Sequence, residues 1–271
     1  MSETLRDMPV IFFMMDGVRP DAIDAADTPT LDGMRQRGAY TAMAQSVMPS
    51  ITLPCHMSIF KSVPPSRHGI LQNEYMPLAR PVMGLIEHLH NNGIDSAMYY
   101  NWDYLRDVVQ PGHLYRNFYS NTSLDPEGDV PTVEAACEGI SKNDAKFSFV
   151  YLGTTDTMGH AAGWMSDMYL RQIEKIDGLI AQVLHAAPAN SRVLIHSDHG
   201  GHERTHGTDM PEDMNIPWML AGPGIKEGHA IGRDVSLLDT APTIASLFGL
   251  EPHQQWEGSP VTEAYVDGGM A

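Results

Sequence analysis

Short apolar runs alternate with segments of helical periodicity along this chain. The runs are bounded by glycine, proline or small polar residues, which is typical of buried strands. We predict strands at residues 9–15, 39–45, 95–100, 147–153, 192–197 and 216–221. We predict helices at residues 29–37, 54–61, 80–92, 131–142, 166–186 and 237–248. Strands that alternate with helices indicate an α/β fold in which a mostly parallel central sheet has helices on both faces.

Two stretches, residues 101–130 and 200–215, interrupt this pattern. Because long irregular segments in compact domains usually carry function, we predict active-site loops or a small cap there. Residues 251–271 are predicted to be a tail on the surface. The chain has 271 residues, of which 42% are hydrophobic, and it shows no internal repeat or long linker. These features predict a single domain over residues 1–271.

Charge and cysteine content narrow the choice of partners. The formal net charge of -17 argues against a nucleic acid polymer or an anionic membrane, since no basic stripe exists to replace phosphate counterions. No apolar stretch has the length of a membrane span. The two cysteines, Cys55 and Cys137, suit a reducing compartment, and the N-terminus lacks the basic region of a signal peptide. We therefore predict a cytoplasmic location.

Acidic and histidine side chains follow three of the predicted strands. They are Asp16, Asp156, His160, Asp198, His199 and His206. Each alone is explained as an ordinary turn residue, but the carboxyl ends of parallel strands meet at one edge of a sheet. Asp156 and His160 are also four residues apart, which places them on one side of a helical turn. The whole set predicts a shared metal site, and metal ions would attract an anionic substrate to this acidic chain.

A hydroxyl group precedes one of the predicted helices, where its alkoxide could bridge the metal ions. Thr52 lies just before Leu53 and Pro54, where proline suits the first turn of a helix. Metal coordination activates such a hydroxyl as a nucleophile, and the helix N-terminus points free N–H groups at a phosphate. A threonine at this position is also typical of a helix cap, and both roles are compatible.

Five segments resemble the alkaline phosphatase superfamily and, within it, the type I phosphodiesterase/nucleotide pyrophosphatase branch. They are residues 15–20, 49–54, 66–70 with Asn73 following, 156–160 and 197–201. They cover most of the chain and occur in the family's order. The resemblance implies an alkaline-phosphatase-like catalytic domain. Because the chain is short for this superfamily, we expect no large cap domain.

The resemblance also implies roles for individual residues. One metal ion would be bound by Asp16, Thr52, Asp198 and His199, and a second by Asp156, His160 and His206. Family members usually hold zinc, and manganese is the alternative for two divalent ions bound by mixed Asp/His ligands. Thr52 would be the nucleophile, and Asn73 would donate a hydrogen bond to a phosphate oxygen.

Two competing motifs are weaker. His202 to His206 spell H-E-x-x-H, but Gly200-Gly201 before the motif and Gly207 and Pro211 after it leave no room for the helix of a zinc protease. His206 fits the pattern of short family members, and His202 is the fallback ligand. Sulfatases carry Cys-x-Pro-x-Arg where this chain has Thr52-x-Pro54 followed by Cys55 and His56, so Cys55 is predicted to be core packing.

We therefore predict a metal-dependent hydrolase of small phosphodiester or pyrophosphate-type substrates that acts through a phosphothreonyl intermediate. The alternatives are a phosphomonoesterase or phosphonate hydrolase on the same core, and a non-catalytic metal-binding scaffold. A monoesterase needs extra cationic groups, which Arg19, Arg67 and Arg106 would supply. Residues 101–103 would line a leaving-group pocket, and His56 is expected to be an ordinary core or surface histidine. The sequence leaves the leaving group, the native metal and the oligomeric state open.

Overall fold

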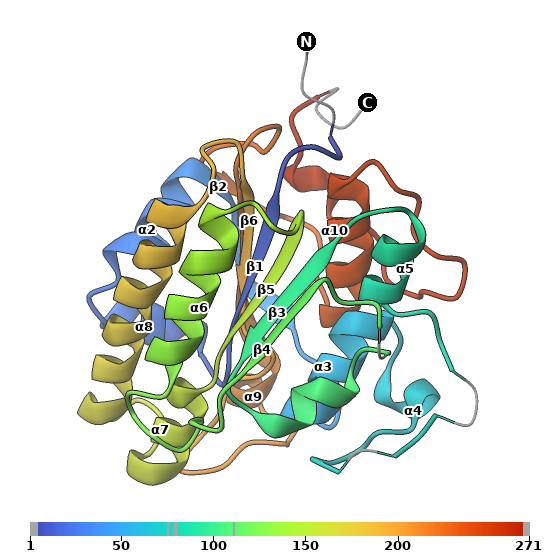
Figure 1. Ribbon diagram of the computed structural model, residues 1–271. Helices are drawn as coiled ribbons and strands as arrows, with labels where there is room; N and C mark the ends of the chain where they lie inside the picture. Colours follow the sequence, from blue (N-terminus) through green and yellow to red (C-terminus); the bar gives the residue numbers. More distant parts are fainter. Residues whose placement is uncertain (1–4, 75, 79–80, 111, 268–271) are drawn as a thin grey trace.

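A central sheet of eight strands organises the computed structural model, which describes residues 5–74, 76–78, 81–110 and 112–267 (Figure 1). The strands are β1 (Val10–Met15), β2 (Gly38–Gln45), β3 (Ser96–Tyr100), β4 (Arg116–Tyr119), β5 (Phe147–Leu152), β6 (Arg192–His196), β7 (Asn215–Ala221) and β8 (His229–Ala230). Their order is β4-β3-β5-β1-β6-β7-β2-β8. Only β7 runs antiparallel to its neighbours, so the mostly parallel sheet is confirmed.

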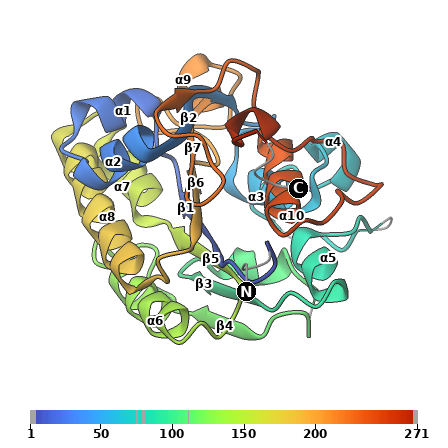
Figure 2. The same ribbon diagram turned by 90° about the horizontal axis from the view of Figure 1, so that it is seen from above.

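Helices cover both faces of the sheet, as predicted (Figure 2). One face is covered by α1 (Pro20–Ala25), α2 (Pro29–Arg37), α6 (Asp129–Ser141), α7 (Thr154–Ala162) and α8 (Asp167–Ala186). The other face is covered by α3 (Thr52–Lys61), α4 (Pro65–His68), α5 (Leu85–Asn91) and α10 (Thr240–Leu247). The remaining short helices are α9 (Pro211–Met214), η1 (Asp103–Asp107), η2 (Leu237–Asp239) and η3 (Thr262–Ala264). None of the helices within the described ranges has both the length and the apolarity to cross a membrane.

Strand β1 shows why the apolar runs identify the sheet. All six of its residues are buried, with alternate side chains in the two hydrophobic clusters of the core. Val10, Phe12 and Met14 belong to one cluster, while Ile11, Phe13 and Met15 belong to the other. A strand covered on both faces has no solvent side, so its sequence is continuously apolar.

The register of three neighbouring strands positions the site. Strand β1 lies between β5 and β6 and is parallel to both, with Met15 opposite Leu152 and Met14 opposite His196. The chain therefore leaves these three strands at the same edge of the sheet. Asp16 follows β1 directly, Asp198 comes two residues after β6, and the helix α7 begins two residues after β5.

Part of the stretch at residues 101–130 is more regular than predicted. It contains the helix η1 and β4, which extends the sheet at its edge. Arg116 and Phe118 of β4 are half-buried, while Asn117 and Tyr119 are exposed. An edge strand with two polar residues in four lacks the apolar run of a central strand, which is why it is missed. Pro111 lies outside the described residues.

Two other boundaries differ from the prediction. The predicted helix 80–92 is observed as α5, from Leu85 to Asn91, and its predicted start at Arg80 lies outside the described residues. The surface tail predicted at 251–271 is wrong, because Trp256, Val261 and Ala264 are buried. Trp256 also donates a hydrogen bond from Nε1 to the carbonyl oxygen of Met83, at 2.7 Å. This segment therefore packs beside α5.

Candidate active site

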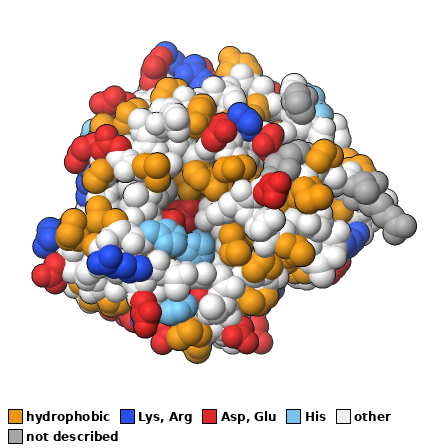
Figure 3. Space-filling model, turned by 90° about the horizontal axis from the view of Figure 1, so that it is seen from below, with side chains coloured by type: hydrophobic (Ala, Val, Ile, Leu, Met, Phe, Trp, Pro, Cys, Tyr) orange, Lys and Arg blue, Asp and Glu red, His pale blue; other side chains and the backbone are white. Residues whose placement is uncertain are grey.

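Carboxylate and imidazole groups from the three strand ends lie close together. Asp16, Asp198 and His199 form one set of neighbours, and Asp156, His199 and His206 form a second, with the ligand atoms of each set within 4.8 Å of one another. His199 belongs to both sets. Its Nε2 is 3.3 Å from Oδ1 of Asp16 and 3.5 Å from Oδ2 of Asp198. Figure 3 shows histidine and acidic side chains inside a hollow on this face of the molecule.

The three histidines are oriented alike. In each ring, Nδ1 faces a backbone carbonyl oxygen. The distances are 2.8 Å from His199 to Gly200, 2.8 Å from His206 to Ser50 and 2.9 Å from His160 to Arg204. A carbonyl oxygen only accepts, so Nδ1 carries the hydrogen in each ring. Each Nε2 then presents a lone pair toward the carboxylates, as in second-shell support of metal-ligating histidines. Nε2 of His160 is 3.5 Å from Oδ2 of Asp156, and Nε2 of His206 is 3.6 Å from Oδ1 of the same aspartate.

Three carboxylate oxygens in this cluster have no hydrogen-bond partner among the described residues. They are Oδ1 of Asp16, Oδ1 of Asp156 and Oδ2 of Asp198, and all three are buried. Burial raises the pKa of Asp16 well above its usual value, and the nearby Asp198 and Asp156 raise it further. Burial also raises the pKa of Asp198. Because unpaired buried charge is costly, the set fits divalent cations as the missing partners.

Burial acts on the histidines in the opposite direction. It lowers the pKa of His199, and it lowers the pKa of His206 to about 4, with the neighbouring His199 as a further cause. The two rings stack with their centroids 3.9 Å apart. Both imidazoles are therefore neutral at physiological pH, which is the form that binds a metal. The neutral nitrogen and carboxylate oxygen donors match the preferences of zinc and manganese.

Other groups hold the carboxylates in place. The hydroxyl of Tyr151 donates a hydrogen bond to Oδ2 of Asp16, which leaves Oδ1 free. The backbone N–H groups of Gly17 and His199 donate to Oδ1 of Asp198, at 3.2 and 3.0 Å, which leaves Oδ2 free. The sequence did not single out Tyr151, because an aromatic residue within the apolar run 147–153 is indistinguishable from core packing.

Gly17 has a backbone requirement of its own. Its φ of 67° lies in the left-handed region, which glycine adopts without strain. A Cβ atom at this position would lie 3.1 Å from both Cβ and Oδ1 of Asp156. The glycine therefore allows the ends of β1 and β5 to approach closely, with their carboxylates side by side.

Thr52 occupies the first position of α3, and Ile51 holds the capping position. Its hydroxyl is thus not used as a helix cap, and Oγ1 lies 3.2 Å from Nε2 of His199. Asn73 accepts a hydrogen bond through Oδ1 from the backbone N–H of Leu53, at 2.9 Å. This bond fixes the Asn73 side chain and leaves its NH₂ group available for a ligand.

A cavity of about 380 Å³ opens onto these groups. It is lined by Asp16, Thr52, Asn73, Trp102, Ser123, Leu124, Tyr151, Gly153, Asp156, Thr157, His160, Ala161 and His206. Among the described lining residues there is no lysine or arginine. Of the predicted residues 101–103, only Trp102 contributes, since Asn101 is buried and donates to Oδ1 of Asp129.

The three arginines considered as cationic groups are paired elsewhere. Arg19 forms an ion pair with Asp21 at 2.6 Å, Arg67 with Glu257 at 2.6 Å, and Arg106 with Asp103 at 2.9 Å. None of the three lines the cavity. The expectation that they supply positive charge to the site is therefore not met by this structure.

The segment 202–206 is not helical, as expected from its flanking glycines. The backbone of His202 and Thr205 exchanges two hydrogen bonds of 2.9 Å, and Glu203 has a φ of 48°. Nδ1 of His202 lies 2.7 Å from Oδ1 of Asp213, so its ring is held by that carboxylate. Among the described residues, His206 belongs to one of the two candidate ligand sets, and His202 and His160 belong to neither.

His56 was expected to be an ordinary histidine, but it touches the site. It is fully buried, and Nδ1 lies 2.8 Å from the carbonyl oxygen of Thr52 and 3.6 Å from Oδ2 of Asp198. Its position four residues after Thr52, on the same side of α3, is the signal that the sequence offered. Cys55, by contrast, is buried core packing as expected.

Comparison with known proteins places this geometry in a family. The chain is 23% identical over 291 residues to mouse ectonucleotide pyrophosphatase/phosphodiesterase family member 3, an alignment that covers 92% of this chain and 32% of that protein. It is 30% identical over 147 residues to a 2,3-bisphosphoglycerate-independent phosphoglycerate mutase from Gracilaria tenuistipitata var. liui, covering 52% of this chain and 28% of the mutase. The chain thus spans about a third or less of the length of these relatives.

Solved structures share the fold at low identity. An inactive threonine-to-alanine variant of murine ectonucleotide pyrophosphatase/phosphodiesterase 5, in complex with AMP, matches with a TM-score of 0.77 at 16% identity, over 96% of this chain and 100% of that one. A 2-O GAG sulfatase matches with a TM-score of 0.80 at 16% identity, over 95% of this chain and 74% of that one. The profile of the type I phosphodiesterase/nucleotide pyrophosphatase family matches residues 10–83 and 85–215. The chain therefore belongs to the type I phosphodiesterase/nucleotide pyrophosphatase family.

Proposed function

We propose that this protein hydrolyses phosphodiester or pyrophosphate-type esters with Thr52 as nucleophile and two divalent metal ions as cofactors. The observation that carries the proposal is the position of the Thr52 hydroxyl, 3.2 Å from Nε2 of His199 and beside three unpartnered carboxylate oxygens. A threonine that only begins a helix does not require a neighbouring histidine and unpaired carboxylates. Family membership supports the same reaction class.

The ligand assignment keeps the roles that the resemblance implies, with His160, whose Nε2 is 3.5 Å from Asp156, in place of His199 in the second set. Asp16, Thr52, Asp198 and His199 would hold one ion, and Asp156, His160 and His206 would hold the other. When bound, such ions lower the pKa of a coordinated hydroxyl and neutralise negative charge on the phosphoryl group. Zinc is the metal that this ligand set suits best, with manganese as the alternative.

Thr52 and Asn73 would act on the substrate directly. Oγ1 of Thr52 attacks phosphorus, a new P–O bond forms, and the bond to the leaving oxygen breaks with its electron pair. The hydroxyl proton passes to solvent through the open cavity. A water molecule then attacks the phosphothreonyl group, the bond to Oγ1 breaks, and Thr52 regains a proton. The NH₂ group of Asn73 donates to a non-bridging oxygen throughout.

The lining of the cavity favours diesters over monoesters. A monoester carries an additional negatively charged oxygen, and the described cavity wall offers it no lysine or arginine. A diester places its second substituent against apolar surface instead. Trp102 and the exposed Leu124 provide that surface. A nucleotide-like substituent fits this wall, and a related murine protein was crystallised with AMP.

Turnover of a substrate panel by zinc- or manganese-loaded protein tests the proposal. We expect bis-p-nitrophenyl phosphate and dinucleotides to be cleaved faster than p-nitrophenyl phosphate or phosphonoacetate. Faster cleavage of p-nitrophenyl phosphate or phosphonoacetate would instead establish a phosphomonoesterase or phosphonate hydrolase. If the protein bound two ions, measured by elemental analysis, yet cleaved none of the esters, a non-catalytic scaffold would be the correct description.

A further inference from the structure

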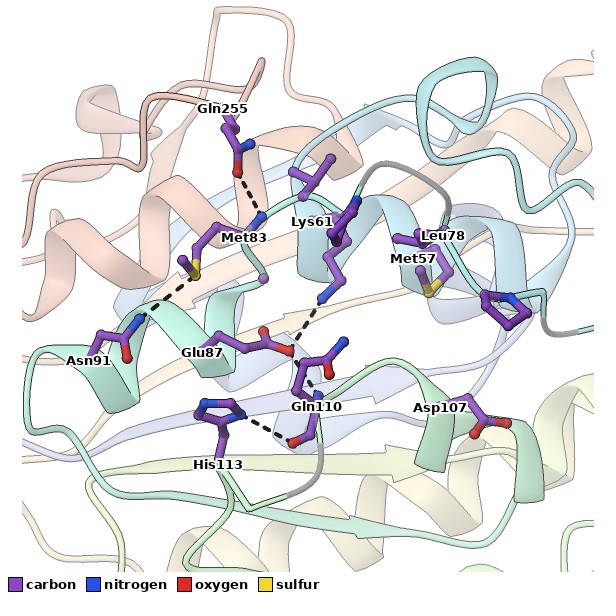
Figure 4. A pocket seen from close by; sticks show the side chains of 14 residues that line it. Met57, Lys61, Leu78, Met83, Glu87, Asn91, Asp107, Gln110, His113 and Gln255 are labelled. Carbon is purple, nitrogen blue, oxygen red and sulfur yellow. Dashed lines mark hydrogen bonds and ion pairs between the residues drawn. The ribbon is translucent and has the colours of Figure 1, made fainter.

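A second cavity, of about 520 Å³, lies at the other end of α3 and shares no lining residue with the candidate active site. Helix α3 contributes Met57 and Lys61 to it, and α5 contributes Glu87 (Figure 4). Leu78 and Val82 complete an apolar wall. A cavity of this size accommodates a small organic molecule.

Two opposite charges are buried in this cavity. Lys61 is 4% exposed and Glu87 is 5% exposed, and Figure 4 shows their charged ends pointing toward each other. Nζ of Lys61 lies 3.4 Å from Oε1 of Glu87, which is longer than a charge-assisted hydrogen bond of about 2.8 Å. The same Oε1 accepts the backbone N–H of Gln110 at 2.8 Å.

The ammonium group of Lys61 makes fewer hydrogen bonds than it can donate. It has three donors, and its one hydrogen bond among the described residues is the long contact with Glu87. Oε2 of Glu87 forms no hydrogen bond within the same ranges, because both hydrogen bonds to this carboxylate go to Oε1. A buried polar pair therefore offers a donor and an acceptor next to each other, against an apolar wall.

The charges decide what such a site would bind. An anion would be attracted by Lys61 but repelled by Glu87, and a cation would be attracted by Glu87 but repelled by Lys61. Asp107, the other carboxylate among the described wall residues, already faces Arg106 at 3.6 Å. The complementary ligand is a neutral molecule with an acceptor for Lys61 beside a donor for Glu87. A heterocyclic lactam, with its C=O next to its N–H, has this edge and a flat, weakly hydrated body.

We propose that this cavity is a binding site for a neutral lactam heterocycle of nucleobase or nucleoside size. The lactam oxygen accepts from Nζ of Lys61, and the lactam N–H donates to Oε2 of Glu87. The ring packs against Met57, Leu78 and Val82. The site is separate from the proposed reaction at Thr52 and requires no metal.

Calorimetric titration of the full chain with inosine, which carries the lactam edge and no phosphate, tests this site. We expect saturable binding with a Kd below about 1 mM. Inosine methylated at N1 lacks the only donor of that edge, and it should bind at least about tenfold more weakly because Glu87 loses its partner. Equal binding of both nucleosides would overturn the proposal, as would an absence of binding by inosine.

Two methionine variants locate the binding. Met83→Trp places a large ring at the wall of this cavity, whereas Met168→Trp adds the same ring to an exposed position on α8. We expect Met83→Trp to weaken inosine binding at least about tenfold and Met168→Trp to leave it unchanged. Turnover of bis-p-nitrophenyl phosphate and thermal unfolding would report whether each variant is folded. Undiminished inosine binding by folded Met83→Trp protein would place the nucleoside elsewhere and overturn the assignment.

Discussion

The two cavities at the ends of α3 handle buried charge in opposite ways. At the start of the helix, carboxylate oxygens of Asp16, Asp156 and Asp198 lie buried without hydrogen-bond partners among the described residues. At its end, the carboxylate of Glu87 has the ammonium group of Lys61 beside it. Uncompensated negative charge favours binding of a cation from outside the chain, whereas a carboxylate paired with an ammonium group favours a neutral ligand. The same helix thus separates two different kinds of binding chemistry.

The largest expected effect is on the nucleophile. Thr52→Ala should reduce the turnover of bis-p-nitrophenyl phosphate at least about a thousandfold, as removal of a nucleophile does. Because carboxylates and histidines supply the other ligands, the variant should keep most of its metal, measured by elemental analysis. Residual turnover near that of the wild-type protein would exclude Thr52 as the nucleophile.

Neutralising one buried carboxylate near each end of α3 should shift stability in opposite directions. Glu87→Gln leaves the Lys61 ammonium buried without its counter-ion and should destabilise the protein by about 3 kcal/mol. Asp198→Asn removes an uncompensated charge, keeps the oxygen that accepts from Gly17 and His199, and should stabilise the metal-free protein by about 1 kcal/mol.

Chemical denaturation in the presence of a chelator measures both shifts. The Asp198→Asn protein should also lose metal binding and turnover, so its gain in stability would accompany a loss of function. Destabilisation of the metal-free protein by Asp198→Asn would show that the carboxylates near β1 are compensated within the chain. The contrast between the two cavities would then fail.

A smaller effect is expected from a residue that supports a ligand. Tyr151→Phe removes the hydroxyl that donates to Oδ2 of Asp16 and leaves the ring in place. Loss of such support typically weakens metal binding about 10- to 100-fold. Competition with a coloured chelator gives the metal Kd, and an unchanged Kd would assign Tyr151 to packing alone.

The last prediction concerns a pH effect at the middle of α3, where Nε2 of His68 lies 3.0 Å from the hydroxyl of Ser58. Burial lowers the pKa of His68 from 6.5 to about 4 in the folded protein. The unfolded chain therefore binds a proton more readily between these values, and stability that is complete above pH 6.5 is lost as the pH falls toward 4. The loss should reach about 2 kcal/mol near pH 5.

Denaturation curves at pH 7.5 and pH 5 measure this contribution. His68→Gln cannot take up the proton, so its stability should fall by about 2 kcal/mol less than that of the wild-type protein over the same interval. An identical pH dependence in both proteins would contradict the lowered pKa. The two cavities at the ends of α3 contain none of the atoms that change in this variant.

The central strands and the candidate ligand residues could be predicted from the sequence, for one physical reason. Strands β1, β5 and β6 are covered on both faces, so each is rich in apolar residues, and an aspartate of the site follows within four residues of its end. The strand β4 was missed because an exposed edge permits polar residues. The burial of Trp256 was missed as well, since scattered prolines and glycines conceal which face of an irregular segment packs inward.

Residues that reach the site only through the folding of the chain were the hardest to predict. Tyr151 and His56 contact Asp16 and Asp198 from other elements. The four-residue spacing from Thr52 is a signal for His56, but no comparable spacing points to Tyr151. The pairing of Lys61 with Glu87 also joins two helices that the pattern gives no reason to connect. The single-domain organisation, the cytoplasmic location and the individual ligand roles remain predictions.

The two proposed ion positions differ in depth, and this has a kinetic consequence. Asp16 and Asp198 are almost entirely enclosed, whereas the side chain of His160 is 45% exposed and that of Asp156 is 18% exposed. Water reaches the outer position directly, so an ion there would exchange quickly with the medium. An ion held by Asp16 and Asp198 would leave slowly, past its neighbour. Partial dialysis should therefore yield a long-lived species with one ion, distinguishable from the fully loaded protein by its stoichiometry.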